Sequence, residues 1–195
     1  PTGSGKTTTL YAALNELNTR EKKIITVEDP VEYRLPGLNQ VQVHEKIDLS
    51  FSRVLRSALR QDPDIILLGE MRDQETAEIG MRAAMTGHLV LSTLHTNDAL
   101  STPIRLLDMG VPRYMVALSI QMVLAQRLVR VICENCSVPH EPLPHEHLWL
   151  KVELGDQVDA MQYRRGQGCS HCANTGYQGR QAVYEILDMN NALVE

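Results

Sequence analysis

The first residues of the chain have the types and spacing of a loop that binds the phosphates of a nucleotide. The sequence Pro-Thr-Gly-Ser-Gly-Lys-Thr matches the pattern G-x-x-x-x-G-K-[ST] from its second position onward. In such a loop the glycines let backbone amides turn inward, the lysine brings positive charge to the β and γ phosphates, and the next hydroxyl is a ligand for Mg²⁺. We therefore predict a nucleotide site formed by Gly3, Ser4, Gly5, Lys6, Thr7 and Thr8.

A chance run of small polar residues is the alternative interpretation of this segment. A helical pattern follows the loop at once, because Leu10, Ala13, Leu14 and Leu17 recur at helical spacing. The N-terminus of that helix, with its dipole, would point at the phosphates. The helix therefore favours the nucleotide-binding interpretation, although the opening glycine of the pattern and a strand before it are not in the sequence.

Acidic residues and a histidine that follow short apolar runs could supply the rest of a hydrolytic site. They are Glu28, Asp29, Glu32, Glu70 and His95. Hydrolysis of a nucleotide needs a carboxylate to activate water, a second one for Mg²⁺, and a donor that senses the γ-phosphate. Each residue alone could belong to a solvated loop or a helix cap. Together they predict a nucleoside triphosphate site.

Four cysteines are arranged as two C-x-x-C pairs, Cys133 with Cys136 and Cys169 with Cys172. Four thiolates at this spacing are typical of a closed, tetrahedral zinc site with a structural role. His171 could replace one of the cysteines. His140, His145 and His147 are expected to lie in a solvated loop instead.

Composition narrows the class of protein. The 195 residues are 43% hydrophobic but only 4% aromatic, and the net charge is −5. This content supports a sizeable aliphatic core, as in a parallel sheet covered on both faces. No long apolar run or signal peptide is evident. The dispersed basic residues do not form the footprint of a nucleic-acid-binding surface, so nucleic acid is not an expected partner.

Three short apolar runs, 24–27, 65–68 and 89–94, are predicted strands separated by helical patterns. This alternation predicts βαβ units, a parallel sheet and an α/β fold, in which ligands bind at the carboxyl ends of the strands. The acids and the histidine named above follow those ends. His88 precedes the third run, so its geometry favours a position away from the phosphates.

Four further helices are expected around this sheet, besides the one after the phosphate loop. One carries Phe51, Val54, Leu55, Ala58 and Leu59 on a single face; the others are expected from Asp73 as cap to Gly87, from about 98 to 109, and over 113–132. The methionine-containing pattern of 113–132 fits core packing better than a cofactor groove. Arg53, Arg56 and Arg60 form a stripe that is either a solvated face or a surface between subunits.

Four motifs, in order along the chain, resemble those of the secretion ATPase superfamily. The phosphate loop is followed by Ile-Thr-Val-Glu-Asp-Pro-Val-Glu at 25–32, Leu-Arg-Gln-Asp-Pro-Asp-Ile-Ile-Leu-Leu-Gly-Glu-Met-Arg-Asp at 59–73 and Thr-Gly-His-Leu-Val-Leu-Ser-Thr-Leu-His-Thr-Asn-Asp-Ala at 86–99. These resemble the Asp box, the Walker B motif and the His box. The paired cysteines resemble the assembly ATPases of type II secretion and type IV pili, the GspE/PilB group.

The resemblance implies a role for each matching residue. Glu32 corresponds to the catalytic glutamate that polarises water, and Glu70 to the Walker B acid that holds Mg²⁺ through water, with Thr7 as a further Mg²⁺ ligand. His95 is expected to sense the γ-phosphate, while Glu28 and Asp29 support metal or loop geometry. Arg72 pairs locally or reaches a neighbouring subunit. His88 belongs to the family's His box, so a structural and a functional role both stay open.

The resemblance also implies a domain organisation. A RecA-like ATPase core would cover 1–130, a tetracysteine zinc subdomain 131–175, and a return to the core 176–195. The incomplete loop leads us to expect a fragment whose first strand, N-terminal domain and arginine donors lie elsewhere. Residues 1–195 alone are expected neither to bind ATP tightly nor to hydrolyse it.

The resemblance implies a cytoplasmic homo-hexamer with ATP, Mg²⁺ and Zn²⁺ as cofactors. It would work at the inner membrane through a platform protein and a recruiting protein, and would power assembly of a pilus or a secretion pseudopilus. The choice between these two systems stays open. A nucleic-acid translocase with a zinc ribbon and a non-hydrolysing zinc-stapled scaffold are the alternatives.

Overall fold

The computed structural model describes residues 2–189, which form two compact units. Within these residues, 2–127 and 184–189 make up the first unit and 128–183 the second. The cysteine pairs, and the predicted subdomain 131–175, lie in the second unit. Pro1 and the last six residues of the predicted return segment lie outside the described residues.

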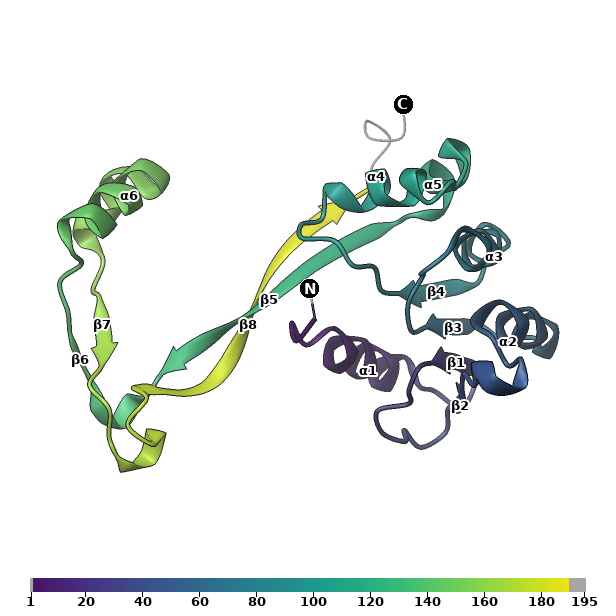
Figure 1. Ribbon diagram of the computed structural model, residues 1–195, viewed down its shortest axis with the longest axis horizontal. Helices are drawn as coiled ribbons and strands as arrows, with labels where there is room; N and C mark the ends of the chain where they lie inside the picture. Colours follow the sequence, from purple (N-terminus) through teal and green to yellow (C-terminus); the bar gives the residue numbers. More distant parts are fainter. Residues whose placement is uncertain (1, 190–195) are drawn as a thin grey trace. The chain divides into compact units, whose positions relative to one another are not determined.

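A four-stranded parallel sheet forms the centre of the first unit (Figure 1). Its strands are β1 (Ile24–Glu28), β2 (Asn39–Gln42), β3 (Ile65–Leu68) and β4 (Leu89–Ser92), in the order β2-β1-β3-β4. The predicted α/β class and parallel sheet are confirmed. The third predicted strand is two residues shorter than expected, and β2 was missed because its sequence Asn-Gln-Val-Gln contains no apolar run.

Helices cover both faces of this sheet. Figure 1 shows α1 (Lys6–Leu17) on one side and α2 (Phe51–Ala58) and α3 (Gln74–Met85) on the other. Successive side chains of a strand point to opposite faces. Accordingly, Ile65 and Leu67 of β3 belong to a core cluster with α1, whereas Ile66 and Leu68 belong to one with α2. Each fully buried aliphatic side chain of this kind contributes about 1.5–3 kcal/mol to folding.

Polar side chains cap the start of both helices on the second face, and the cap predicted at Asp73 is confirmed. The side chain of Ser50 accepts a hydrogen bond from the Arg53 amide at the start of α2, at 3.4 Å. Asp73 caps α3 in the same way, accepting from the Thr76 amide at 2.8 Å. Gly87, with φ of 103°, follows the end of α3 and takes the chain toward β4.

The expected helix over 113–132 is wrong in its second half. Only α5 (Arg113–Ser119) is helical, and β5 (Met122–Ile132) follows it. Met115 and Val116 of α5 pack in a core cluster with α3 and with α4 (Ser101–Asp108), as expected. The β5 segment is rich in valine, which favours a strand when a partner strand is present.

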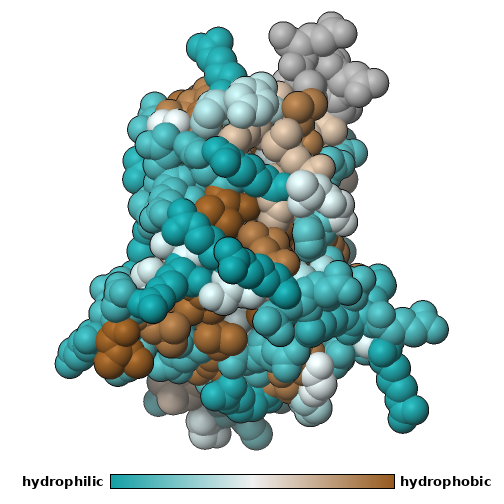
Figure 2. All heavy atoms as spheres, turned by 90° about the vertical axis from the view of Figure 1, so that its right-hand side faces the viewer, coloured by the Kyte–Doolittle hydropathy of each residue, from teal (hydrophilic) through white to brown (hydrophobic). Residues whose placement is uncertain are grey.

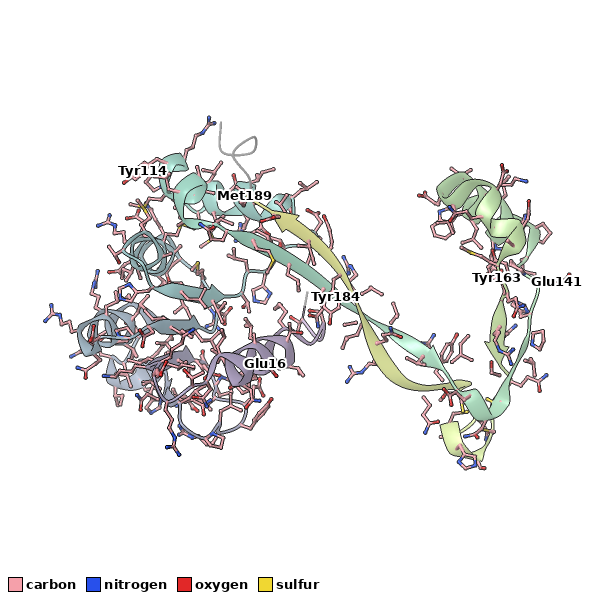
Figure 3. The ribbon with its side chains drawn as sticks, turned by 180° about the vertical axis from the view of Figure 1, so that it is seen from behind. Glu16, Tyr114, Glu141, Tyr163, Tyr184 and Met189 are labelled. Atoms are coloured by element: carbon pink, nitrogen blue, oxygen red, sulfur yellow. The ribbon has the colours of Figure 1, made fainter. Side chains whose placement is uncertain are left out.

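The partner of β5 comes from the far end of the chain. It is β8 (Tyr177–Asp188), which forms a two-stranded sheet with β5. Met189, labelled with Tyr184 in Figure 3, follows β8 and donates its backbone N–H to the Gln121 carbonyl at 2.9 Å. Because this pairing is non-local, the periodicity of the β5 sequence alone could not predict it.

The second unit contains a short antiparallel pair, β6 (Ser137–Pro139) with β7 (Arg164–Gly166), and a helix, α6 (Pro144–Leu154). His145 and His147 lie in α6, so the loop expected for them is wrong. Proline at the first helical position and the Glu146 carboxylate, which accepts from the Leu143 amide at 2.8 Å, account for the helix. Nowhere in 2–189 is there a helix of the length and hydropathy that a membrane crossing requires.

Candidate functional site: the phosphate loop, its acids and a tetracysteine cluster

The sequence-predicted site residues of the first unit line one pocket of about 510 Å³. The phosphate loop contributes Gly3 to Thr8, and the ends of β1, β3 and β4 contribute the rest. The acids and the histidine on its wall are Glu28, Asp29, Glu32, Glu70 and His95. The lining runs from Thr2 to His95, so residues up to 93 positions apart in the sequence meet in this pocket. It lies where parallel sheets bind their ligands, at the carboxyl ends of the strands.

The phosphate loop has the backbone that its glycines permit. Gly3 and Gly5 have φ of 75° and 83°, in the left-handed region that residues other than glycine rarely adopt. A Cβ at Gly3 would meet no atom within 4 Å, so backbone conformation and not crowding requires glycine there. Helix α1 begins at Lys6, directly after this turn. Its N-terminus faces the loop and favours an anion such as phosphate.

Glu70 is held between two cationic or protonatable side chains. Its carboxylate pairs with the Arg72 guanidinium, and His95 Nε2 lies 3.2 Å from its second oxygen. Arg72 also reaches Asp29, at 3.4 Å, so it bridges the ends of β3 and β1. The hydrogen bond from Arg72 and the Arg72 charge, with a smaller contribution from the contact with His95, outweigh the effect of burial and hold the pKa of Glu70 below its usual range. Glu70 is therefore an anion at neutral pH, as a metal-binding carboxylate must be.

Glu28, at the end of β1, is buried and accepts hydrogen bonds from several side chains. It is 3% exposed, and its carboxylate accepts hydrogen bonds from the Tyr11 hydroxyl, from Thr26 and from Gln40. Burial, with the neighbouring Glu28 carboxylate, raises the pKa of Tyr11 to about 12. The Tyr11 oxygen also accepts from the backbone amide of Glu32 at 3.3 Å. Tyr11 thus joins α1, β1 and the segment that carries Glu32.

Tyr11 was missed by the sequence prediction, although a signal was present. It lies three residues before Leu14, and both are buried against the sheet at 1% and 0% exposure. Residues at this spacing share a helix face. A tyrosine on a buried face needs a partner for its hydroxyl, which points to a carboxylate such as Glu28.

Glu32 itself is exposed to solvent on the pocket wall. The ring of its neighbour Tyr33 packs edge-on against the Tyr11 ring, with the two ring centroids 4.6 Å apart.

His88 lies away from this pocket. Its Nδ1 is 2.9 Å from the Ala83 carbonyl and 3.2 Å from the Thr86 hydroxyl, at the end of α3. It is not among the residues that line the pocket, so its contacts are those of a helix-terminating side chain.

The predicted arginine stripe is exposed; Arg53 and Arg56 lie on α2, and Arg60 follows it in a short 3-10 helix, Leu59–Gln61. Arg53 pairs with Asp48, and Arg56 with Glu75 at 2.6 Å. Figure 2 views the molecule from the side of α2 and α3 and shows hydrophilic residues interspersed with hydrophobic ones. Exposed pairs of this kind contribute about 0–1 kcal/mol to stability. These contacts fit a solvated face, and a surface between subunits stays a prediction.

The four cysteines of the second unit converge. The Sγ atoms of Cys133, Cys136, Cys169 and Cys172 all lie within 4.8 Å of one another. Three of the sulfur pairs are separated by 3.9, 3.9 and 3.7 Å. A Zn–S bond of about 2.3 Å in a tetrahedral site corresponds to sulfur atoms about 3.8 Å apart. The cluster therefore fits zinc, and His171 is exposed and not one of its members.

Backbone amides also prepare this cluster for a metal. The Cys172 sulfur accepts from the amides of Cys169 and Gly176, at 3.2 and 3.3 Å. Burial opposes ionisation of this thiol, but the two amides, together with hydrogen bonds from the thiols of Cys169 and Cys136, outweigh it and lower the pKa of Cys172 to about 6. A thiolate is the form that binds metal.

Comparison with known proteins shows the family to which the chain belongs. The family model described as "Type II/IV secretion system protein" matches residues 1–195. Type II secretion system protein E of Aeromonas hydrophila is 49% identical over 195 residues, covering 100% of this chain and 38% of that protein. The type IV pilus assembly ATPase PilB of Myxococcus xanthus is 51% identical over 198 residues, covering 100% and 34%.

Among solved structures, the pilus retraction motor PilT with bound ADP aligns with a TM-score of 0.68 and 33% identity, over 100% of this chain and 47% of that one. The chain spans 38% of the length of the A. hydrophila protein and 34% of the length of the M. xanthus protein. The match of the family model is complete along the chain. This protein belongs to the type II/IV secretion system protein family.

Proposed function

We propose that this chain provides the nucleotide site of an ATPase that converts ATP and water to ADP and phosphate. The observation that carries the proposal is the pocket in which the phosphate loop meets Glu32, Glu70 and His95. Its solved relative PilT binds ADP, and the relative from M. xanthus is named an assembly ATPase. The names of these relatives give no support to a nucleic-acid translocase.

Each part of the pocket has a task in this proposal. The amides at the start of α1 and the Lys6 ammonium hold the β and γ phosphates. Glu32 accepts a proton from the attacking water, and its exposed side chain is free to meet that water in the pocket. His95, beside Glu70, donates to the γ-phosphate. Mg²⁺, held by Thr7 and through water by Glu70, would neutralise charge on the phosphates.

We further propose that hydrolysis powers assembly of a type IV pilus or of a type II secretion pseudopilus. The support is the identity of about half the residues to proteins named for each system. The protein would act as a homo-hexamer in the cytoplasm, bound at the inner membrane through a platform protein and a recruiting protein. Zinc at the tetracysteine cluster would hold the second unit together and take no part in hydrolysis.

The variant Glu32→Gln tests this function in the intact protein, expressed from its complete gene. It removes the proton acceptor but keeps the shape, so ATP should still bind while hydrolysis falls by about 10²-fold or more. Cells carrying the variant should lose pili or secreted substrates. Glu16→Gln is the matched control, because Glu16 lies on α1, is exposed and is not part of the pocket (Figure 3).

Two results would count against the proposal. Hydrolysis by Glu32→Gln at the wild-type rate would remove Glu32 from the mechanism. Normal assembly in cells whose protein cannot hydrolyse ATP would refute the motor function and favour a scaffold.

A further inference from the structure

A buried glutamine far along the chain contacts the phosphate loop. Gln126 of β5 is 5% exposed. Its side-chain Nε2 donates to the Ser4 carbonyl at 2.6 Å, and its Oε1 accepts from the Thr9 hydroxyl at 2.7 Å. Both partners lie in the first unit with it, more than 110 positions earlier in the sequence (117 and 122). Gln126 is not among the residues that line the nucleotide pocket.

The bond to Ser4 sets the direction of a neighbouring amide. The Ser4 carbonyl and the Gly5 N–H belong to one peptide unit, which is planar and trans, so they point in opposite directions. A donor that holds the carbonyl on one side therefore aims the N–H to the other. Rotation of this peptide depends on ψ of Ser4 and on φ of Gly5, and at Gly5, whose φ is 83°, there is no Cβ to restrict it.

Thr9 holds the other end of the Gln126 amide. An amide side chain can turn over and exchange its oxygen and nitrogen. The turned-over form would place the Gln126 oxygen against the Ser4 carbonyl oxygen, and two acceptors cannot form a hydrogen bond with each other. The Ser4 carbonyl, which can only accept, therefore sets the direction of the amide, and the Thr9 hydroxyl donates to the Oε1 that then faces it. Both polar ends of the buried amide are thus satisfied.

We propose that Gln126 is a positioning residue for nucleotide binding, which holds the Ser4–Gly5 peptide so that the Gly5 amide faces the phosphates. It acts through the loop and does not touch the nucleotide. This inference rests on the proposed ATPase function, because it names a residue that prepares the same site. It also assigns β5 a task in the nucleotide site that its position outside the central parallel sheet does not suggest.

The variant Gln126→Glu tests the inference, because it keeps the size of the side chain but replaces the donor with a carboxylate. In the intact protein, we expect its affinity for a fluorescent ATP analogue with Mg²⁺ to fall about tenfold, the effect of losing one well-placed buried hydrogen bond. KM for ATP should rise by a similar factor, with a smaller change in kcat. Gln121→Glu is the control, since Gln121 is exposed and lies just before the same strand.

A second variant, Thr9→Val, separates positioning from folding. It removes only the hydroxyl that donates to Gln126 Oε1, so we expect a smaller loss of affinity, about threefold, and no additional loss when it is combined with Gln126→Glu. Thermal unfolding without nucleotide identifies variants that do not fold. If Gln126→Glu does not fold, Thr9→Val decides alone, and wild-type affinity in that variant overturns the inference.

The outcomes distinguish this inference from the function beneath it. A wild-type protein that binds no ATP would contradict the proposed function itself. A wild-type protein that binds and hydrolyses ATP, beside a folded Gln126→Glu variant with unchanged affinity and KM, would contradict only the role of Gln126.

Discussion

Tyr11 shows how a single side chain can join the elements of this site. Its hydroxyl donates to the buried Glu28 carboxylate and accepts from the Glu32 amide. A carboxylate that is 3% exposed depends on such donors, because burying it without them is unfavourable. The bond from the Glu32 amide keeps the segment after β1 near α1, the helix that follows the phosphate loop.

Tyr11→Phe should therefore lower the free energy of unfolding by about 1–3 kcal/mol, as expected when a buried acceptor loses its partner. Urea denaturation of the intact protein measures this change. Tyr33→Phe is the control; Tyr33 is 51% exposed, and its loss of a hydroxyl should change stability by less than about 0.5 kcal/mol. Equal stability of Tyr11→Phe and wild type would show that the hydrogen bond is not needed.

The raised pKa of Tyr11 makes the stability of the folded protein depend on pH. Because folding raises this pKa from 10.0 to about 12, the folded protein binds the phenolic proton more tightly than the unfolded chain. The resulting stabilisation is complete below pH 10 and is lost as the pH rises toward 12. In Tyr11→Phe this component is absent, so stability measured across that range should fall less steeply than in wild type.

Secondary structure was predictable where a local pattern determines it. The apolar runs of β1 and β3 and the aspartate cap of α3 are local features, and the structure confirms them. Strand β5 was mistaken for helix because its pairing with β8 is non-local. Polar β2 gave no apolar signal. The same limit hid Gln126, whose partners lie more than 110 positions away (117 and 122).

The two cysteine-bearing turns of the second unit give a prediction about metal. Protein purified under reducing conditions should contain one zinc ion per chain, and Cys133→Ser should lose it, because the cluster offers four ligands and Cys133 is buried. Loss of the metal should make 128–183 more open to proteolysis, since binding of structural zinc contributes about 10 kcal/mol to folding.

Elemental analysis and limited proteolysis measure these effects. His171→Ala is the control, because His171 is exposed and outside the cluster, and it should retain zinc. Full zinc content in Cys133→Ser, or none in the reduced wild-type protein, would contradict the assignment.

Over the whole molecule, the residues that form the two sites could be predicted from the sequence, whereas the residues that support the nucleotide site could not. The phosphate loop, its acids and the cysteine pairs are sequence motifs, and the fold brings the members of each together. Their supports, Tyr11 and Gln126, depend on tertiary packing and became visible only in the structure. The family match agrees with the motifs, and the proposed activity depends on the pocket they form.

Release of phosphate from ATP by the intact protein, with and without Mg²⁺, is the decisive measurement for this account. We expect steady Mg²⁺-dependent release by wild type and a loss of about 10²-fold or more in Lys6→Ala, because the lysine charge at the β and γ phosphates is removed. Phosphate release that is absent from the folded wild-type protein, or that is equal in Lys6→Ala, would contradict the account.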